Sequence, residues 1–271
     1  MLAPLKTAAK FLCKNTLWAD GAVRTVLLGP SAGLRYRIFP NYGLAPIFGG
    51  WEPRLQTIMK RLLKLGDVAY DVGANYGIHT LLMARLVGAG GHVYGFEPHP
   101  EIHAACLENV RLNAFNNVDI LKLALSDHEG DIPFSTGHHD GAGHVAAAEE
   151  EASMTVRCDT IDSLIAAGRL RPPQFLKVDI EGYAGAALAG AAGAFARHRP
   201  ALCVDLHDPE EDEAVGGFLA DWGYAAFRQE TFEPIKRLDV GWPNPDGIRG
   251  TVLALPAERA DQLCWLHADK G

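Results

Sequence analysis

An acidic residue and two glycines follow the first apolar run in the central part of the chain. Asp71 opens the segment DVGANYG at positions 71–77, which lies between that run and a helical pattern. Gly73 lets a ligand approach the backbone closely, and Gly77 lets the helix pack tightly on the sheet. A second acid, Glu97, stands at the end of the next apolar run. This pattern predicts a ligand site at the carboxyl ends of two parallel strands.

Two phosphate-binding patterns do not fit this segment. A dinucleotide motif G-x-G-x-x-G that starts at Gly73 requires glycine where the chain has Asn75 and Ile78. A P-loop requires G-K-S or G-K-T, but Gly77 is followed by Ile78 and His79. The segment therefore disfavours a nicotinamide dehydrogenase and a P-loop nucleotidase.

The two acids indicate a ligand that carries positive charge. A carboxylate at Asp71 repels a pyrophosphate but suits an ammonium group, and one at Glu97 can accept hydrogen bonds from both hydroxyls of a ribose. A nucleoside with a positively charged amino-acid tail meets both demands, and S-adenosylmethionine is such a molecule. Either acid alone has an alternative role as a helix cap or turn residue; the two together favour the cofactor.

Composition narrows the class of protein. The 271 residues carry a formal net charge of −8, which argues against a nucleic-acid partner because such proteins usually present a basic face. The five cysteines are scattered and form no C-x-x-C pair, so neither a disulfide framework nor a zinc site is expected, and a cytoplasmic location is favoured. No apolar stretch approaches the ~20 residues that span a bilayer, so membrane insertion is not expected.

Apolar runs alternate with helical patterns from about residue 68 onward, which predicts a doubly wound, Rossmann-like α/β fold with a mostly parallel sheet. The expected strands are Val68–Val72, His92–Phe96, Val118–Leu123, Phe175–Ile180, Ala201–Leu206 and Tyr224–Phe227. The expected helices are Ile78–Val87, Pro100–Ala114, Thr160–Ala167, Tyr183–Ala196 and Glu210–Trp222.

Two regions stand apart from this alternation. Residues 1–50 predict a small N-terminal cap, with a helix and then a hairpin of Val23–Leu28 and Leu34–Phe39. Residues 51–271 are expected to form the cofactor-binding domain. Within it, residues 136–152 predict a mobile loop between strands.

The chain resembles the FkbM-type family of class I methyltransferases. The likeness covers roughly residues 27–228 and rests on DVGANYG at 71–77, VYGFEP at 93–98, ALSD at 124–127, CDTIDSL at 158–164 and LKVDIEG at 176–182, after GWEP at 50–53 and LGD at 65–67. It implies a seven-stranded sheet, S-adenosylmethionine as cofactor, and methyl transfer to a hydroxyl of a sugar or secondary metabolite. The alternative is a non-catalytic S-adenosylmethionine-binding module of a biosynthetic complex.

Carried onto this chain, the resemblance implies a set of cofactor-binding residues: Asp71, Gly73, Ala74, Asn75, Tyr76, Gly77, Thr80, Glu97, Pro98, Ser126, Asp127 and Asp179. Asp71, Gly73, Asn75 and Gly77 would line the methionyl end of the cofactor. Glu97 would hold the ribose, and Ser126 and Asp127 would lie near the adenine. The chain departs from the family pattern at Ala184 and Asp205, where the family often has an acid and a glutamate respectively.

An alcohol is a poor nucleophile, so a base near its proton would assist the transfer. The candidates are Asp179, Glu181 and His207, all expected at strand ends. His207 has an alternative role as a turn residue, and Glu181 as a helix cap.

Metal-ligating residue types occur in two places. Asp179 and Glu181 are compatible with Mg²⁺ but lack an evident third ligand, and a second candidate cluster comprises His138, His139, Asp140 and His144. No metal is expected. His79 and Glu52 are each predicted either to approach the cofactor or to face solvent.

Overall fold

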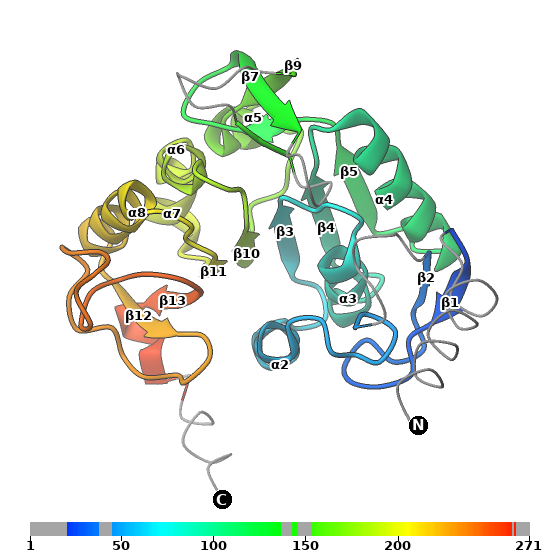
Figure 1. Cartoon of the computed structure of the whole chain (residues 1–271), viewed down its shortest axis with the longest axis horizontal. Helices are drawn as coiled ribbons and strands as arrows, with labels where there is room; N and C mark the ends of the chain where they lie inside the picture. Colours follow the sequence, from blue (N-terminus) through cyan, green and yellow to red (C-terminus); the bar gives the residue numbers. More distant parts are fainter. Residues whose placement is uncertain (1–20, 38–44, 137–142, 146–152, 262, 264–271) are drawn as a thin grey trace, which may run out of the picture.

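The protein is described by a computed structural model that covers residues 21–37, 45–136, 143–145, 153–261 and 263. Its centre is a seven-stranded sheet (Figure 1). The strand order is β12 (Tyr224–Arg228), β13 (Val252–Pro256), β11 (Ala201–Val204), β10 (Phe175–Val178), β3 (Val68–Val72), β4 (His92–Phe96) and β5 (Val118–Leu121). All neighbouring pairs are parallel except those made by β13, which runs antiparallel to both β11 and β12.

The six strands expected from the apolar runs are all present. β3 and β4 have the predicted bounds, whereas β5, β10 and β11 end two residues earlier than predicted. The seventh strand is β13, which the pattern of apolar runs did not identify. The doubly wound, mostly parallel sheet of seven strands is confirmed.

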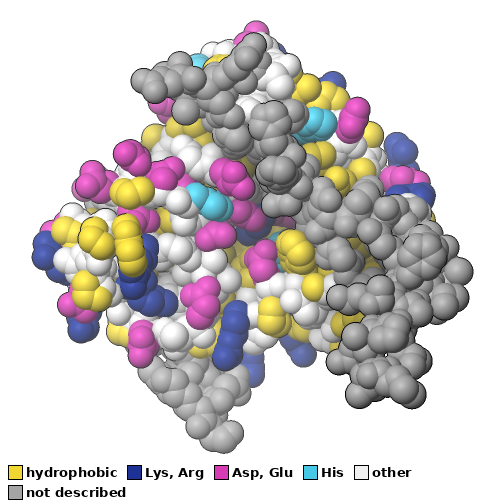
Figure 2. All heavy atoms as spheres, in the orientation of Figure 1, with side chains coloured by type: hydrophobic (Ala, Val, Ile, Leu, Met, Phe, Trp, Pro, Cys, Tyr) yellow, Lys and Arg dark blue, Asp and Glu magenta, His cyan; other side chains and the backbone are white. Residues whose placement is uncertain are grey.

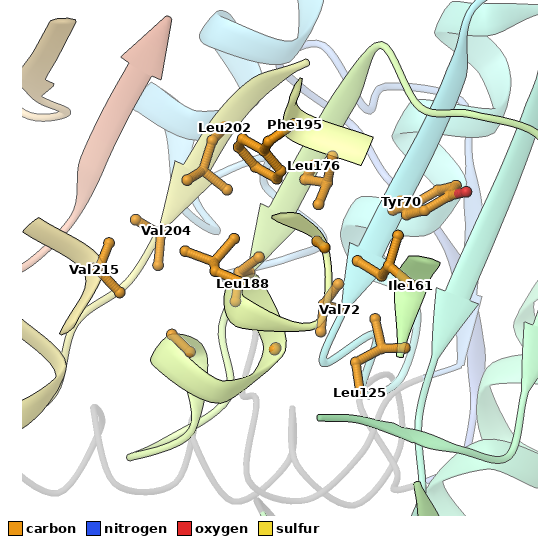
Figure 3. Packing of buried hydrophobic residues seen from close by; sticks show 14 of the residues in the cluster. Tyr70, Val72, Leu125, Ile161, Leu176, Leu188, Phe195, Leu202, Val204 and Val215 are labelled. Atoms are coloured by element: carbon orange, nitrogen blue, oxygen red, sulfur yellow. The ribbon is translucent and has the colours of Figure 1, made fainter. Parts of the chain in front are cut away.

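Helices cover both faces of the sheet (Figure 1). One face packs against α2 (Pro53–Leu62), α3 (Ile78–Val87) and α4 (Pro100–Leu112). The other packs against α5 (Ile161–Ala166), α6 (Ala184–Ala189), α7 (Ala192–His198) and α8 (Pro209–Asp221). Alternate residues of a strand point to opposite faces, so Tyr70 joins the core beneath Leu188 and Phe195 (Figure 3), while Ala69 joins the core beneath α3.

The single helix predicted over Tyr183–Ala196 is wrong, because it is divided into α6 and α7 at Gly190 and Ala191. A Cβ on Gly190 would lie 2.0 Å from the backbone oxygen of Ser126. Glycine therefore allows the end of α6 to contact the loop that follows β6 (Ala124–Leu125).

A second sheet, which the sequence did not predict, lies beside the first. Its strand order is β6, β9 (Met154–Asp159), β7 (Gly130–Thr136) and β8 (Gly143–Val145). Ile132, Phe134 and Val156 form its small core. Part of the predicted loop 136–152 is thus a strand, since β8 pairs with β7; residues 137–142 and 146–152 lie outside the described residues.

The predicted N-terminal hairpin is present in a shorter form, as β1 (Val23–Thr25) and β2 (Arg35–Arg37). It packs on α3 and α4 through contacts that include Tyr36 and Val110. Asn109 of α4 joins it to the glycine turn, because its Oδ1 accepts from the Arg37 N–H at 3.0 Å and its Nδ2 donates to the Tyr76 carbonyl at 2.9 Å. The helix predicted before the hairpin lies outside the described residues, and the domain boundary near residue 50 stays a prediction. In the described part of the chain, no helix combines the length and apolarity needed to cross a bilayer.

Candidate functional site

The segment after β3 forms a tight turn that brings three strand ends together. Gly73, Asn75 and Gly77 all have left-handed backbone conformations, with φ of 78°, 49° and 87°. The N–H groups of Gly73 and Ala74 both donate to the Phe96 carbonyl at the end of β4, at 3.1 and 2.9 Å. A Cβ on Gly73 would lie 2.0 Å from the backbone oxygen of Asp179. Only glycine fits where the turn meets the end of β10.

A cavity of about 220 Å³ opens above this turn. Eight of the predicted site residues line it: Gly73, Ala74, Asn75, Tyr76, Glu97, Pro98, Asp179 and Glu181. Trp51, Glu52, His79, Lys177 and Tyr183 also contribute to its wall. Figure 2 shows acidic side chains gathered near the middle of the face viewed. Segments far apart in the sequence thus meet at the carboxyl ends of β3, β4 and β10.

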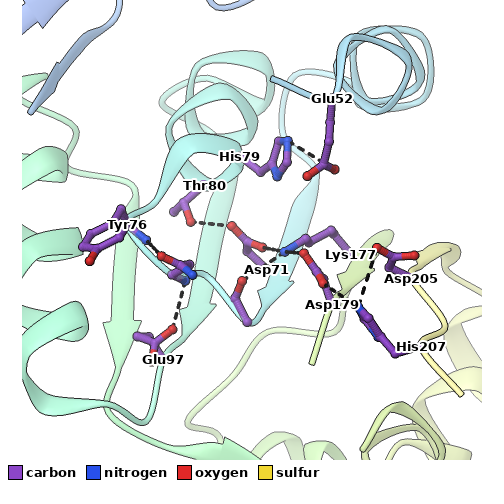
Figure 4. Close-up of polar contacts among 12 residues, drawn as sticks. Glu52, Asp71, Tyr76, His79, Thr80, Glu97, Lys177, Asp179, Asp205 and His207 are labelled. Carbon is purple, nitrogen blue, oxygen red and sulfur yellow. Dashed lines mark hydrogen bonds and ion pairs between the residues drawn. The ribbon is translucent and has the colours of Figure 1, made fainter. Parts of the chain in front are cut away.

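Glu97 is a buried carboxylate at the wall of this cavity. Its Oε2 accepts from the Asn75 N–H at 3.0 Å (Figure 4). Its Oε1 accepts from the His99 N–H at 2.9 Å. Burial raises the pKa of Glu97 to about 7, although both backbone donors oppose this. Each oxygen keeps a lone pair for a further donor, so the group is suited to the two hydroxyls of a ribose.

Asp71 has no exposed surface and does not line the cavity. Its Oδ2 accepts from the Thr80 hydroxyl at 2.5 Å, and its Oδ1 lies 3.3 Å from Nζ of Lys177. Thr80 is likewise fully buried. In the described structure both side chains support the turn from below, rather than facing the space where a ligand would bind.

Lys177 is a central residue of the cavity wall that the sequence analysis did not single out. Its side chain is buried in the middle of the site, with Nζ 3.2 Å from Asp179 Oδ2 and 3.0 Å from the Gly73 carbonyl, to which it donates (Figure 4). Burial alone would lower the pKa of Lys177, but the carboxylates of Asp179 and Asp71 outweigh it and raise the pKa. The sequence did contain a signal for this residue, because Lys177 is the one charged residue in an otherwise apolar strand. A lysine is almost never fully buried unless it is paired, so a charged partner could have been expected.

Asp179 follows β10 directly and faces the cavity with about a third of its side chain exposed. Burial acts to raise the pKa of Asp179, but the neighbouring Lys177 ammonium outweighs it, so the pKa is lowered. The carboxylate is therefore ionised at neutral pH, at the wall of the cavity.

His207 lies beside Asp179 but is not on the cavity wall. Its Nδ1 is 3.4 Å from Glu211 Oε2, and its Nε2 is 3.7 Å from both Asp179 and Asp205. The hydrogen bond with Glu211, helped by the two aspartates, raises the pKa of His207 to about 9. The imidazole is therefore protonated at neutral pH, which does not favour its predicted role as a base.

The predicted metal-ligating residues are only partly brought together. Ligand atoms of Asp179, Asp205 and His207 lie within 4.8 Å of one another, so this group could hold a cation, and Glu181 is not part of it. Within this group the two aspartate carboxylates already lie next to cations. Lys177 contacts Asp179, and protonated His207 lies beside both aspartates. His138, His139 and Asp140 lie outside the described residues, and His144 is placed only as a member of β8.

The predicted adenine-side residues lie next to the cavity. Ser126 is buried, and its Oγ is 3.1 Å from the Tyr183 hydroxyl, which belongs to a lining residue. Asp127 contacts Nδ1 of His128 at 2.7 Å, and this hydrogen bond lowers the pKa of Asp127. Contact of either residue with the cofactor stays a prediction.

Comparison with known proteins places the chain in a family. Residues 71–228 match the model of the methyltransferase FkbM domain, and these residues contain most of the site described above. The chain belongs to the FkbM methyltransferases. S-adenosylmethionine is the cofactor of this class, and the buried carboxylate of Glu97, with its free lone pairs, fits the ribose of that molecule.

Individual relatives of this FkbM methyltransferase differ in how much they share with it. Hexuronic acid methyltransferase AglP of Haloferax volcanii is 30% identical over 205 residues, which cover 74% of this chain and 82% of that protein. A protein-L-isoaspartate O-methyltransferase of Ignicoccus hospitalis is 41% identical over 59 residues, or 22% of this chain and 28% of that protein. The crystal structure of methyltransferase FkbM from Methylobacillus flagellatus has a TM-score of 0.44 and 17% identity, with 70% of this chain and 43% of that chain covered.

Proposed function

We propose that this FkbM methyltransferase transfers a methyl group from S-adenosylmethionine to a hydroxyl oxygen of a sugar. The likeness to a hexuronic acid methyltransferase over 82% of that protein's length supports a sugar as the acceptor. The observation that carries the choice of oxygen is the ionised Asp179 carboxylate at the cavity wall, since a hydroxyl must lose a proton during the transfer.

The residues of the cavity have separate tasks in this reaction. Bound S-adenosylmethionine supplies an electrophilic methyl group on its sulfonium. Glu97 holds the ribose, and the glycine turn allows a close approach to the backbone, which aligns the donor for in-line displacement. Asp179 accepts the hydroxyl proton late in the transfer. Lys177 keeps Asp179 ionised and in place, 3.2 Å away.

The charge of the cavity favours a neutral acceptor over a carboxylate. Four acids line it, namely Glu52, Glu97, Asp179 and Glu181, whereas Lys177 is the one lysine or arginine among the lining residues. That lysine is already bound to Asp71, Asp179 and a carbonyl. A uronate carboxylate would meet repulsion from these acids, and among the described lining residues no lysine or arginine is free to balance it. A hydroxyl, which can donate to a carboxylate, would not.

The test is a reaction with S-adenosylmethionine and a panel of glycosides that includes matched neutral and uronic-acid forms. Mass spectrometry should find a one-methyl gain on neutral glycosides, at a position that nuclear magnetic resonance assigns to a hydroxyl. Asp179→Asn should lower kcat by about 10²-fold or more, whereas the exposed Asp131→Asn should not change it. Normal cofactor binding with no methylated product from any glycoside would instead support the non-catalytic binding module.

A further inference from the structure

We propose that Glu52, rather than Asp71, holds the ammonium group of S-adenosylmethionine. Glu52 immediately precedes α2 and lines the cavity together with Trp51. Its side chain is 38% exposed there, whereas Asp71 is sealed beneath the turn. The inference depends on the cofactor alone and not on the proposed sugar acceptor.

The described residues balance the charge of Glu52 only in part. Burial raises the pKa of Glu52, and the charges of Asp179 and Asp71 raise it further. The Lys177 ammonium and a side-chain hydrogen bond with Trp51 lower it, but the pKa remains raised. Lys177 is already paired with both aspartates. A carboxylate in this setting is stabilised by a cation that arrives with the ligand, and the methionyl end of S-adenosylmethionine carries one.

A buried histidine next to Glu52 gives a second, independent indication that a polar group of a ligand binds at this part of the cavity wall. His79 is 5% exposed, and its Nε2 has no hydrogen-bond partner. That atom points at Glu52, 3.8 Å from its Oε2, which is too long for a hydrogen bond (Figure 4). Burial, with the Lys177 charge, lowers the pKa of His79 to about 4. The imidazole is neutral and therefore supplies no charge to Glu52.

The order of strands sets the direction in which the cofactor lies. Glu97, which follows β4, lines the cavity and is the carboxylate that we assign to the ribose. On the β5 side the wall is apolar, with Leu123 and Leu125, and suits an adenine ring. On the β3 and β10 side it carries the charged groups, and Glu52 lies there, across the glycine turn from Glu97 (Figure 4). The charged tail therefore extends toward Glu52.

Glu52 also has the backbone of a constrained residue. Its φ of 41° is left-handed, which is uncommon for a residue other than glycine, asparagine or aspartate. Such a conformation persists only where the surroundings impose it, and it often occurs at ligand-binding positions. Here it directs the side chain of the residue before α2 into the cavity.

Binding calorimetry with three ligands tests the assignment. S-adenosylmethionine and S-adenosylhomocysteine both carry the ammonium group, whereas 5′-methylthioadenosine lacks the whole amino-acid end. Glu52→Gln should raise the Kd of the first two by about tenfold or more and leave that of 5′-methylthioadenosine unchanged. Glu97→Gln should weaken all three, because all three carry the ribose.

Several outcomes would overturn the proposal. Equal weakening of all three ligands by Glu52→Gln would mean a general effect on the cavity, and weakening of S-adenosylmethionine alone would mean a contact to the sulfonium. An ammonium-selective loss in Asp179→Asn, with none in Glu52→Gln, would move the role to Asp179. Glu52→Asp withdraws the carboxylate by one methylene and should give the same selectivity with a smaller loss, which keeps the test decisive if Glu52→Gln fails to fold. Absence of sugar methylation would not affect these results.

Discussion

Nζ of Lys177 on β10 lies 3.3 Å from Oδ1 of Asp71 on β3, in a place where neither side chain has appreciable contact with water. The two strands are direct neighbours, and these two residues are register partners in the sheet. An ion pair thus joins the strands directly beneath the glycine turn. The same ammonium also reaches Asp179 and the Gly73 carbonyl, so the stability of the sheet and the shape of the cavity depend on one group.

Removal of this ammonium should destabilise the fold. Lys177→Met leaves Asp71 as an uncompensated buried charge, which costs about 3–5 kcal/mol. Urea denaturation followed by circular dichroism measures the loss. The double variant Lys177→Met, Asp71→Asn should recover part of it, because neither charge then remains alone. A single-variant loss of less than about 1 kcal/mol would contradict the ion pair.

Cofactor binding should depend on pH through Glu97. The pKa of this carboxyl in the free protein is raised to about 7, chiefly by burial, and the ionised form accepts hydrogen bonds from the ribose. Affinity should therefore be constant well above pH 7 and fall by up to about tenfold per pH unit below it. Calorimetry with 5′-methylthioadenosine isolates the ribose contact from the amino-acid end. An unchanged pH profile in Glu97→Gln would show that another group titrates.

Gly73 should tolerate no side chain. Gly73→Ala adds a Cβ 2.0 Å from the Asp179 carbonyl, at a φ of 78°, so both stability and cofactor affinity should fall. Gly168→Ala is a matched control, because Gly168 has a φ of 68° but nothing within 4 Å of an added Cβ. The control should lose only about 1–2 kcal/mol for the left-handed backbone and keep its affinity. Equal losses in the two variants would rule out the close approach.

Asn109 should couple the hairpin to the cofactor turn. Asn109→Ala removes its hydrogen bonds with the Arg37 N–H and the Tyr76 carbonyl, so the free energy of unfolding should fall by about 1–3 kcal/mol. Cofactor affinity should also decrease, because Tyr76 belongs to the turn. Asn113→Ala breaks more exposed hydrogen bonds to the Arg35 backbone and one to the Asn109 carbonyl, but none to the turn, so it should affect stability alone. Calorimetry and thermal denaturation of both variants separate the two effects.

The parts of the fold that the sequence predicted are those with strong local patterns. β3 and β4 contain only apolar or uncharged residues apart from Asp71 and His92. Each is followed by a turn that contains glycine or proline, so the sequence predicted where both strands begin and end. β13 is equally apolar, but it comes after a long segment without alternating helices, from about residue 229 to 251. The second sheet depends on pairing between segments that are distant in sequence, which local patterns do not encode.

The sequence indicated which residues lie at the candidate site more accurately than it indicated what each of them contacts. Glu97 and residues 73–76 of the glycine turn line the cavity, and their contact with the cofactor stays a prediction. The role of Asp71 could not be anticipated, because its partner Lys177 lies on a strand that is adjacent only in the folded sheet. The opposite behaviour of two histidines, His79 with a lowered pKa and His207 with a raised one, likewise depends on neighbours that are brought together by folding.

The position of β13 has a consequence for the newly made chain. This strand lies between β11 and β12, yet it is the last of the seven to leave the ribosome. Until residues 252–256 emerge, β11 and β12 each expose a row of unsatisfied backbone groups, and such edges pair readily with other chains. Completion of the sheet therefore has to wait until synthesis has passed β13, and the nascent protein is most exposed to aggregation just before that point.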